Sequence, residues 1–251
     1  MLAALDIDIL WPAIAAGLLV IATHVPLGQE VLRRGIIFAD LAVAQIAGLG
    51  VIAAAGLGWE AHGLSVQLFA IGAALFGAWL LYVAELRWPQ VQEAMIGALF
   101  VLAASGGVLL LANNPQAGEH LKELLVGQIL WVQPQALAIV AVLSALVLIG
   151  WFGFGWCRQR FGFYLLFAAS ITASVQLVGV YLVFASLILP ALATRSLTGR
   201  AALLWGYAIG AAGYVLGIAL SAVLDWPTGA ISVWTLALVS ALAAVVGDRR
   251  A

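Results

Sequence analysis

The chain has 251 residues, of which 65% are hydrophobic and 8% are charged, and its formal net charge is −1. A typical soluble domain is about half apolar and about a quarter charged, so this chain has too little polar surface to cover a water-soluble body. Its single lysine and the lack of a basic stripe exclude nucleic acid as a partner.

Apolar stretches long enough to cross a lipid bilayer recur along the whole chain. A transmembrane helix needs about 20 mostly apolar residues. We expect such segments at 9–27, 36–57, 64–82, 91–112, 135–152, 163–189, 201–224 and 229–246. No alternating strand pattern competes with them. The sequence therefore predicts an all-α integral membrane protein, a polytopic bundle of about 8–9 transmembrane helices with a broken or re-entrant segment, in one domain over residues 1–251.

Two segments do not fit a single plain crossing. Residues 113–134 begin polar and become apolar only at LLVGQILWV, so we expect an interfacial helix followed by a short or re-entrant piece. Segment 163–189 is longer than a hydrocarbon core of about 30 Å requires at about 1.5 Å per residue, and Gly179 lies inside it. This segment either tilts, or breaks near Gly179 and turns back.

The positions of the arginines favour the broken form of this segment. Cytoplasmic loops of membrane proteins collect Lys and Arg. The arginines follow the first, third, fifth and sixth predicted spans and end the chain, as Arg33, Arg34, Arg87, Arg158, Arg160, Arg195, Arg200, Arg249 and Arg250. All of them are cytoplasmic if the N-terminus is outside and the sixth segment reverses. The competing layout has eight plain crossings, both termini inside, and Arg33 and Arg34 outside.

Ionisable and amide side chains within spans are costly in lipid, so each is a candidate functional residue. Asp40 lies early in the second span, Gln45 follows it, and Glu93 opens the fourth span. The simpler alternatives are that Asp40 reaches headgroup water at a helix end and that Glu93 complements the helix dipole. His24, close to the predicted end of the first span, is interpreted as polar surface.

No catalytic or nucleotide-binding motif accompanies these residues. The sequence has no HExxH, no GxSxG and no GxxxxGK[ST] phosphate-binding loop. Its only cysteine, Cys157, excludes an intrachain disulfide and a cysteine metal cluster. We therefore expect a transport subunit and not an enzyme, with no cofactor bound by this chain. If ATP drives transport, the ATP binds to a separate chain.

Five blocks of sequence together resemble the permease subunits of the zinc/manganese ABC-importer family. They follow the family's order and extend over nearly the whole chain: PLGQEVLRRGIIFADLAVAQIAGLGV, EAMIGALFVLAASGGVLLL, LLVGQILWV, VGVYLVFASLILPALATR and SAVLDWPTGAISV. The resemblance implies a permease that forms a homodimer in a bacterial inner (plasma) membrane. Cytosolic ATPase subunits would drive it, an extracytoplasmic solute-binding protein would supply it, and zinc or manganese would be the substrate.

The resemblance also implies that Asp40, Gln45 and Glu93 make transient contacts with the metal. The family places a His four residues after the Asp, on the same helix face, where this chain has Ala44. Gln45 aligns with that His if one residue is inserted, and a π-bulge would return Gln45 to the face of Asp40. Because an amide is a poorer zinc ligand than imidazole, another substrate such as a metal chelate is an alternative.

The segment of approximately residues 190–201 resembles the family's cytoplasmic coupling region, which docks on the ATPase. We expect Pro190 to end the span, and Arg195 and Arg200 to lie on a short basic amphipathic piece that packs into a groove of that partner. A plain basic loop is the simpler alternative. From another class of protein, the alternative is a self-sufficient secondary transporter or channel, which would need neither ATP nor partner chains.

Overall fold

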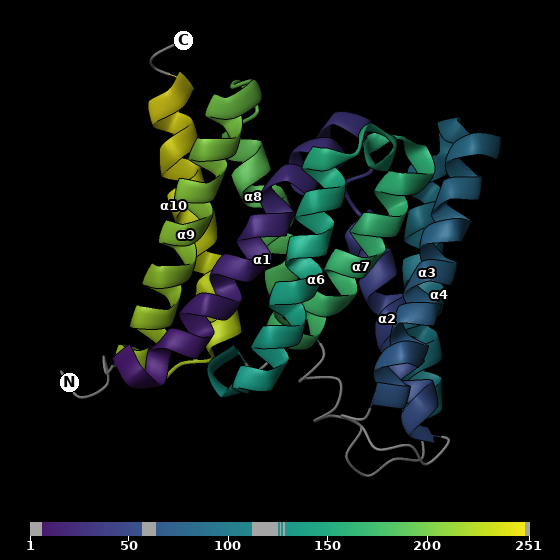
Figure 1. Ribbon diagram of the computed structural model, residues 1–251, viewed down its shortest axis with the longest axis horizontal. Coiled ribbons are helices and arrows are strands. Elements are labelled where there is room, and N and C mark those ends of the chain that lie inside the picture. The colour runs from purple at the N-terminus through teal and green to yellow at the C-terminus, as the bar shows by residue number, and fades with distance from the viewer. Residues whose placement is uncertain (1–6, 57–63, 112–124, 126, 128, 249–251) are drawn as a thin grey trace.

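The computed structural model describes residues 7–56, 64–111, 125, 127 and 129–248 (Figure 1). Within these residues the chain forms helices joined by short turns, without any strand. The α-helices are α1 (Ile7–Arg34), α2 (Ala39–Gly56), α3 (Leu64–Arg87), α4 (Gln92–Leu111), α6 (Pro134–Gly153), α7 (Arg160–Val178), α8 (Val180–Ala193), α9 (Gly199–Leu224) and α10 (Thr228–Asp248). Short 3₁₀ helices are η2 (Pro89–Val91), η3 (Ile129–Trp131) and η4 (Gly155–Arg158).

Seven of the described helices are long and apolar enough to cross a membrane, and α2 and α8 are shorter apolar helices. A lipid environment requires every backbone polar group to find a partner inside the protein, and helices meet this requirement. The prediction of an all-α, polytopic membrane protein is confirmed. The interfacial helix predicted within 113–134 falls largely outside the described residues.

The helices stand side by side in three groups (Figure 1). At one side α2 packs against α3 and α4, and at the other side α10 packs against α9 and α8. Between these groups lie α1, α6 and α7, where α1 contacts α8, α9 and α6, and α7 contacts α3 and α6. The largest buried side chains include the aromatic residues Phe163, Tyr164 and Phe167 of α7. The centre of the bundle is therefore built around α1 and α7.

Segment 163–189 breaks at Gly179, as the arginine pattern predicts. Gly179 separates α7 from α8, and its φ of 78° and ψ of 163° belong to a region that is essentially restricted to glycine. Its amide donates to the Val175 carbonyl at 2.9 Å, and its carbonyl accepts from the Val183 amide at 3.0 Å. One residue thus ends one helix and begins the next. From this point α8 runs back toward the end of the bundle where α7 began (Figure 1).

A second glycine packs against this break. Gly127 belongs to the predicted short apolar piece, and its φ is 68°. A Cβ at Gly127 would lie 2.3 Å from the carbonyl carbon of Val178 and 2.5 Å from the amide nitrogen of Gly179. Only glycine permits so close an approach of two backbones. The short apolar piece therefore contacts the reversal directly.

All seven arginines of the described residues lie at one end of the bundle, here named the arginine end, which is the upper end in Figure 1. The helices α1, α3, α6, α8 and α10 finish at this end, and α1 begins at the opposite end (Figure 1). Because α7 and α8 run in opposite directions, the layout of eight plain crossings is wrong. Arg249 and Arg250 lie outside the described residues, directly after α10.

Two helix ends differ from the sequence prediction. The first span was expected over 9–27, but α1 continues to Arg34, so that its last turn carries the basic residues. Pro190 was expected to end a span, but α8 continues through Pro190 to Ala193. There the Thr194 hydroxyl donates a hydrogen bond of 2.8 Å to the Pro190 carbonyl. A proline removes its own amide hydrogen bond and crowds the carbonyl four residues before it, but the buried packing of α8 sustains the helix past Pro190.

Replacing Gly179 by Ala should destabilise the protein, because a side chain at this φ and ψ costs roughly 1–3 kcal/mol. The expected result is a lower melting temperature of the purified chain in detergent. Gly153→Ala, at the end of α6, is the matched control, since nothing lies within 4 Å of an added Cβ there. Equal melting temperatures for the two variants would contradict the requirement for glycine at the break.

Candidate functional site

Asp40 is buried in the first turn of α2. The residue is 1% exposed, and no side chain of the described residues pairs with its carboxylate, which faces only the backbone amides of Asp40 and Leu41. The interpretation of Asp40 as a helix-end residue in headgroup water is therefore wrong. A buried carboxylate without a partner is costly unless a proton or a cation neutralises it. Both oxygens of Asp40 are thus available to a cation.

Glu93 packs against the loop that precedes α2. Its Oε1 accepts a hydrogen bond of 2.8 Å from the Ile37 amide, and its Oε2 is buried without a partner among the described residues. This bond places the first turn of α4 beside a loop residue three positions before Asp40. Glu93 therefore has a structural contact that explains its position, and one further oxygen that this contact does not use.

Gln45 is buried as well, but on a different face of α2. The helix is regular from Ala39 to Gly56, so the predicted π-bulge is absent and that prediction is wrong. In a regular helix five residues correspond to about 140° around the axis. Because Gln45 is 8% exposed, it faces neighbouring helices and not lipid. Asp40 and Gln45 are both inside the chain without sharing one face.

The described residues hold no group of three or more His, Cys, Asp or Glu side chains that could retain a metal ion. A groove of about 380 Å³ opens between α2, α3 and α4, and apolar residues such as Phe76, Leu99 and Leu102 line it. A cation gains nothing from such a lining, so the groove is not a path for one. The transient metal contacts assigned to Asp40 and Glu93 stay a prediction.

His24 of α1 is buried, contrary to the prediction from sequence. It is 0% exposed, so its interpretation as polar surface is wrong. Its Nδ1 lies 3.2 Å from the Thr23 hydroxyl, which accepts a hydrogen bond of 2.8 Å from Ser170 of α7. Its Nε2 has no partner within the described part of the chain. Recognising that α1 continues to Arg34 would have placed His24 well inside the helix instead of near its end.

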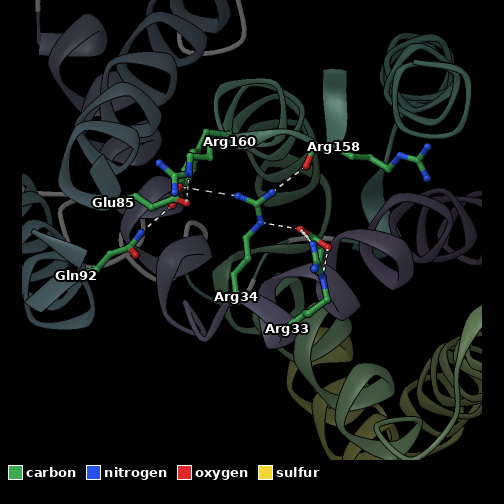
Figure 2. A network of polar contacts seen from close by, with 8 residues as sticks. Arg33, Arg34, Glu85, Gln92, Arg158 and Arg160 are labelled. Carbon is green, nitrogen blue, oxygen red and sulfur yellow. Dashed lines mark hydrogen bonds and ion pairs between the residues drawn. The ribbon is translucent and has the colours of Figure 1, made fainter. Parts of the chain in front are cut away.

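Three arginines and two carboxylates join the arginine ends of α1, α3 and α7 (Figure 2). Glu30 lies 2.6 Å from Arg33 and 2.7 Å from Arg34, both in the last turn of α1. Glu85, near the end of α3, lies 3.3 Å from Arg160 and 3.8 Å from Arg34. Arg34 thus bridges the two carboxylates and ties helices that are far apart in sequence.

Further contacts fix Arg34 and its surroundings. Its side chain is 14% exposed, and its Nη2 donates a hydrogen bond of 2.9 Å to the carbonyl of Arg158. Its guanidinium carbon lies 4.2 Å from the centre of the Phe163 ring, a cation–π contact. Nearby, the Gln92 amide donates to the Tyr164 hydroxyl at 2.8 Å and links α4 to α7. Arg34 and the two carboxylates are therefore shielded from solvent, whereas Arg33 and Arg160 hold the rim of the network from exposed positions.

The predicted coupling region connects α8 to α9 at the arginine end (Figure 1). Arg195 and Arg200 are exposed, whereas Pro190 is buried inside α8. The connection is a short turn, after which α9 begins at Gly199 with φ 58°. Of the three predicted coupling residues, the two arginines are thus positioned for contact with another protein, and their role stays a prediction.

The fold and these buried polar residues define a multi-pass membrane protein of the transporter class. Residues 6–156 and 153–247 match the ABC 3 transport family. The chain belongs to this family and is a permease subunit of an ABC transporter. The resemblance seen in the five sequence blocks is confirmed.

Two solved structures share the fold. PsaBC from Streptococcus pneumoniae, in complex with Fab, has a TM-score of 0.76 at 21% identity, covering 97% of this chain and 95% of that chain. A transporter described as of the metal-chelate ABC type, in an inward-facing conformation, has a TM-score of 0.70 at 19% identity, with coverages of 95% and 85%. At these identities the likeness establishes the fold alone. A comparison with curated protein sequences gives no match.

Replacing Arg34 by Lys should lower the melting temperature of the purified chain. Lysine keeps the charge but cannot bridge Glu30, Glu85 and the Arg158 carbonyl at once, so the expected loss is on the order of 1–3 kcal/mol. Arg200→Lys, at an exposed position of the same end, serves as the control. If both lysine variants had the melting temperature of the wild type, the bridging role of Arg34 would be refuted.

Proposed function

We propose that this chain is the membrane-spanning half of an ABC-type importer for a divalent metal ion, zinc or manganese, in a bacterial cell membrane. The observation that carries the metal assignment is Asp40, whose buried carboxylate has no side-chain partner within the described residues. Such a group offers electrostatic stabilisation to a passing cation where lipid offers none. Glu93 Oε2 provides a second oxygen near the loop before α2, and the Gln45 carbonyl a weaker contact from another face.

In this proposal two copies of the chain enclose the path. Within one chain Asp40 and Gln45 lie on different faces of α2, so one copy of α2 does not bring both side chains to the same ion. Cytosolic ATPase subunits would bind and hydrolyse ATP, because this sequence has no phosphate-binding loop and would itself bind no cofactor. An extracytoplasmic solute-binding protein would deliver the substrate to the opposite end.

The sidedness of this arrangement follows from the arginines. Because cytoplasmic loops collect Lys and Arg, the arginine end would face the cytoplasm. The connection between α8 and α9, with Arg195 and Arg200 exposed, would then meet the ATPase subunits. This orientation supports the coupling role implied by the sequence resemblance.

A metal chelate is the second candidate substrate. Two observations favour it: the family His is replaced by Ala44, and the fold is similar to a transporter described as of the metal-chelate type. Competition separates the two candidates in cells that take up radiolabelled metal. Free zinc or manganese should compete with uptake if the ion is the substrate, whereas only a preformed chelate should compete if the chelate is.

Replacing Asp40 by Asn should reduce metal accumulation in cells by about tenfold or more, because the amide keeps the shape of the carboxylate and removes its charge. The amount of protein in the membrane should not change. Asp225→Asn is the matched control, since Asp225 is exposed after α9 at φ 55°, a conformation that Asn also adopts. Normal metal accumulation in the Asp40→Asn variant would contradict a role of Asp40 in metal transport.

Proteoliposomes test the alternative of a self-sufficient carrier or channel. The purified chain alone should show no flux of zinc or manganese, and flux should require the ATPase subunits and ATP. Flux through the chain alone, down a gradient and without nucleotide, would instead identify a carrier or channel.

A further inference from the structure

We propose that the linker between α6 and α7 binds an anionic phospholipid, with the headgroup on Arg158 and the acyl chains along α6. This lipid site is formed by residues 152–158 together with the outer face of α6. It is separate from the buried carboxylates of α2 and α4 and from the connection between α8 and α9. The proposal does not depend on the identity of the transported substrate.

The linker lies beside an excess of positive charge. Four arginines but only two carboxylates, Glu30 and Glu85, meet in the network of Figure 2, which leaves a local formal charge of +2. Three of the arginines contact the two carboxylates, and the Arg158 side chain is exposed and points away from them (Figure 2). Within the described residues no acid pairs with it. An anion from outside the chain is therefore the partner that its charge favours.

Exposed aromatic side chains lie on either side of Arg158 in the sequence. Phe152, Phe154 and Trp156 are each 53% exposed, and Phe161 is 50% exposed. They lie where α6 ends and α7 begins, at the end of two membrane-spanning helices. Aromatic rings are enriched at this depth, where the apolar ring meets the acyl chains and glycerol beside the headgroups. An arginine among exposed aromatic residues at the membrane interface can bind an anion that also has an apolar part.

A continuous apolar ridge runs along α6. Ile139, Val142, Leu146 and Ile149 are 53–63% exposed and follow one another at intervals of three or four residues, which places them on one face of the helix. The ridge continues into Phe152, so it reaches the linker. A water-soluble acidic partner would not cover this apolar face, whereas the acyl chains of a lipid can pack along it. This continuity decides in favour of a phospholipid.

The linker is held in one conformation before any lipid binds. The Arg158 carbonyl accepts the hydrogen bond of 2.9 Å from Arg34, and Cys157 is 3% exposed. At Gly162 a Cβ would lie 2.5 Å from the carbonyl oxygen of Trp156 and 2.6 Å from the Cα of Cys157, so the turn packs tightly against α7. A preorganised site loses less conformational entropy when it binds.

Native mass spectrometry of the delipidated full chain tests the proposal, with dioleoyl phosphatidylglycerol and dioleoyl phosphatidylcholine as probes. The wild type should bind the anionic lipid several-fold more tightly than the zwitterionic one. Arg158→Gln should weaken binding of phosphatidylglycerol about fivefold, and Arg158→Lys should retain most of it. Trp156→Leu should weaken binding of both lipids. Inorganic phosphate should not compete, because it lacks acyl chains.

Arg200→Gln is the matched control, because it removes an exposed arginine from the same end without touching α6. It should bind phosphatidylglycerol as the wild type does. Equal binding of the two lipids by the wild type would overturn the proposal, and so would wild-type binding by Arg158→Gln. Equal losses in Arg158→Gln and Arg200→Gln would show a response to total charge, which also contradicts a site. A loss of ATPase binding in Arg158→Gln, with lipid binding intact, would identify a protein surface instead.

Discussion

The backbone of Gly179 sets the direction of every helix that follows it. Its positive φ turns α8 back toward the arginine end, where the connection to α9 and the end of α10 then also lie. Gly127 packs against the same turn through a contact that leaves no room for a side chain. A straight helix through this segment would place the exposed Arg195 and Arg200 at the end opposite Arg34. One residue with an unusual conformation therefore decides which surfaces can face a common partner.

The charged residues inside the bundle divide into two kinds. Glu30 and Glu85 are paired with arginines and hold the ends of α1, α3 and α7 together. Asp40 is more deeply buried than either of them but has no side-chain partner in the described residues. Removing one member of a buried pair is strongly destabilising, whereas an unpaired buried charge already carries its desolvation cost and persists where function requires it. This contrast separates the two carboxylates that maintain the structure from Asp40, the main residue that we assign to the substrate.

The sequence was sufficient to predict the spans and the reversal, because lipid requires long apolar helices and the arginines constrain their direction. The sequence did not predict that α1 extends to Arg34, because GQEVLRR is polar enough to resemble a loop. The structure shows that Glu30 pairs with both arginines of the last turn. The burial of His24 was missed for the same reason. The contact between Glu85 and Arg160 depends on packing between segments far apart in the chain. Alignment with the family suggested a π-bulge before Gln45, but the regular helix already buries that side chain.

The reversal at Gly179 requires the α6–α7 and α8–α9 connections to lie on the same side of the membrane. Labelling of introduced cysteines with a membrane-impermeant thiol reagent tests this most directly. Gln159→Cys and Ser196→Cys introduce exposed thiols in the α6–α7 and α8–α9 connections, while the native Cys157 is buried. The account predicts that neither variant is labelled in intact cells and that both are labelled after permeabilisation. Labelling of Gln159→Cys in intact cells, with Ser196→Cys still protected, would place the two connections on opposite sides and contradict the reversal at Gly179.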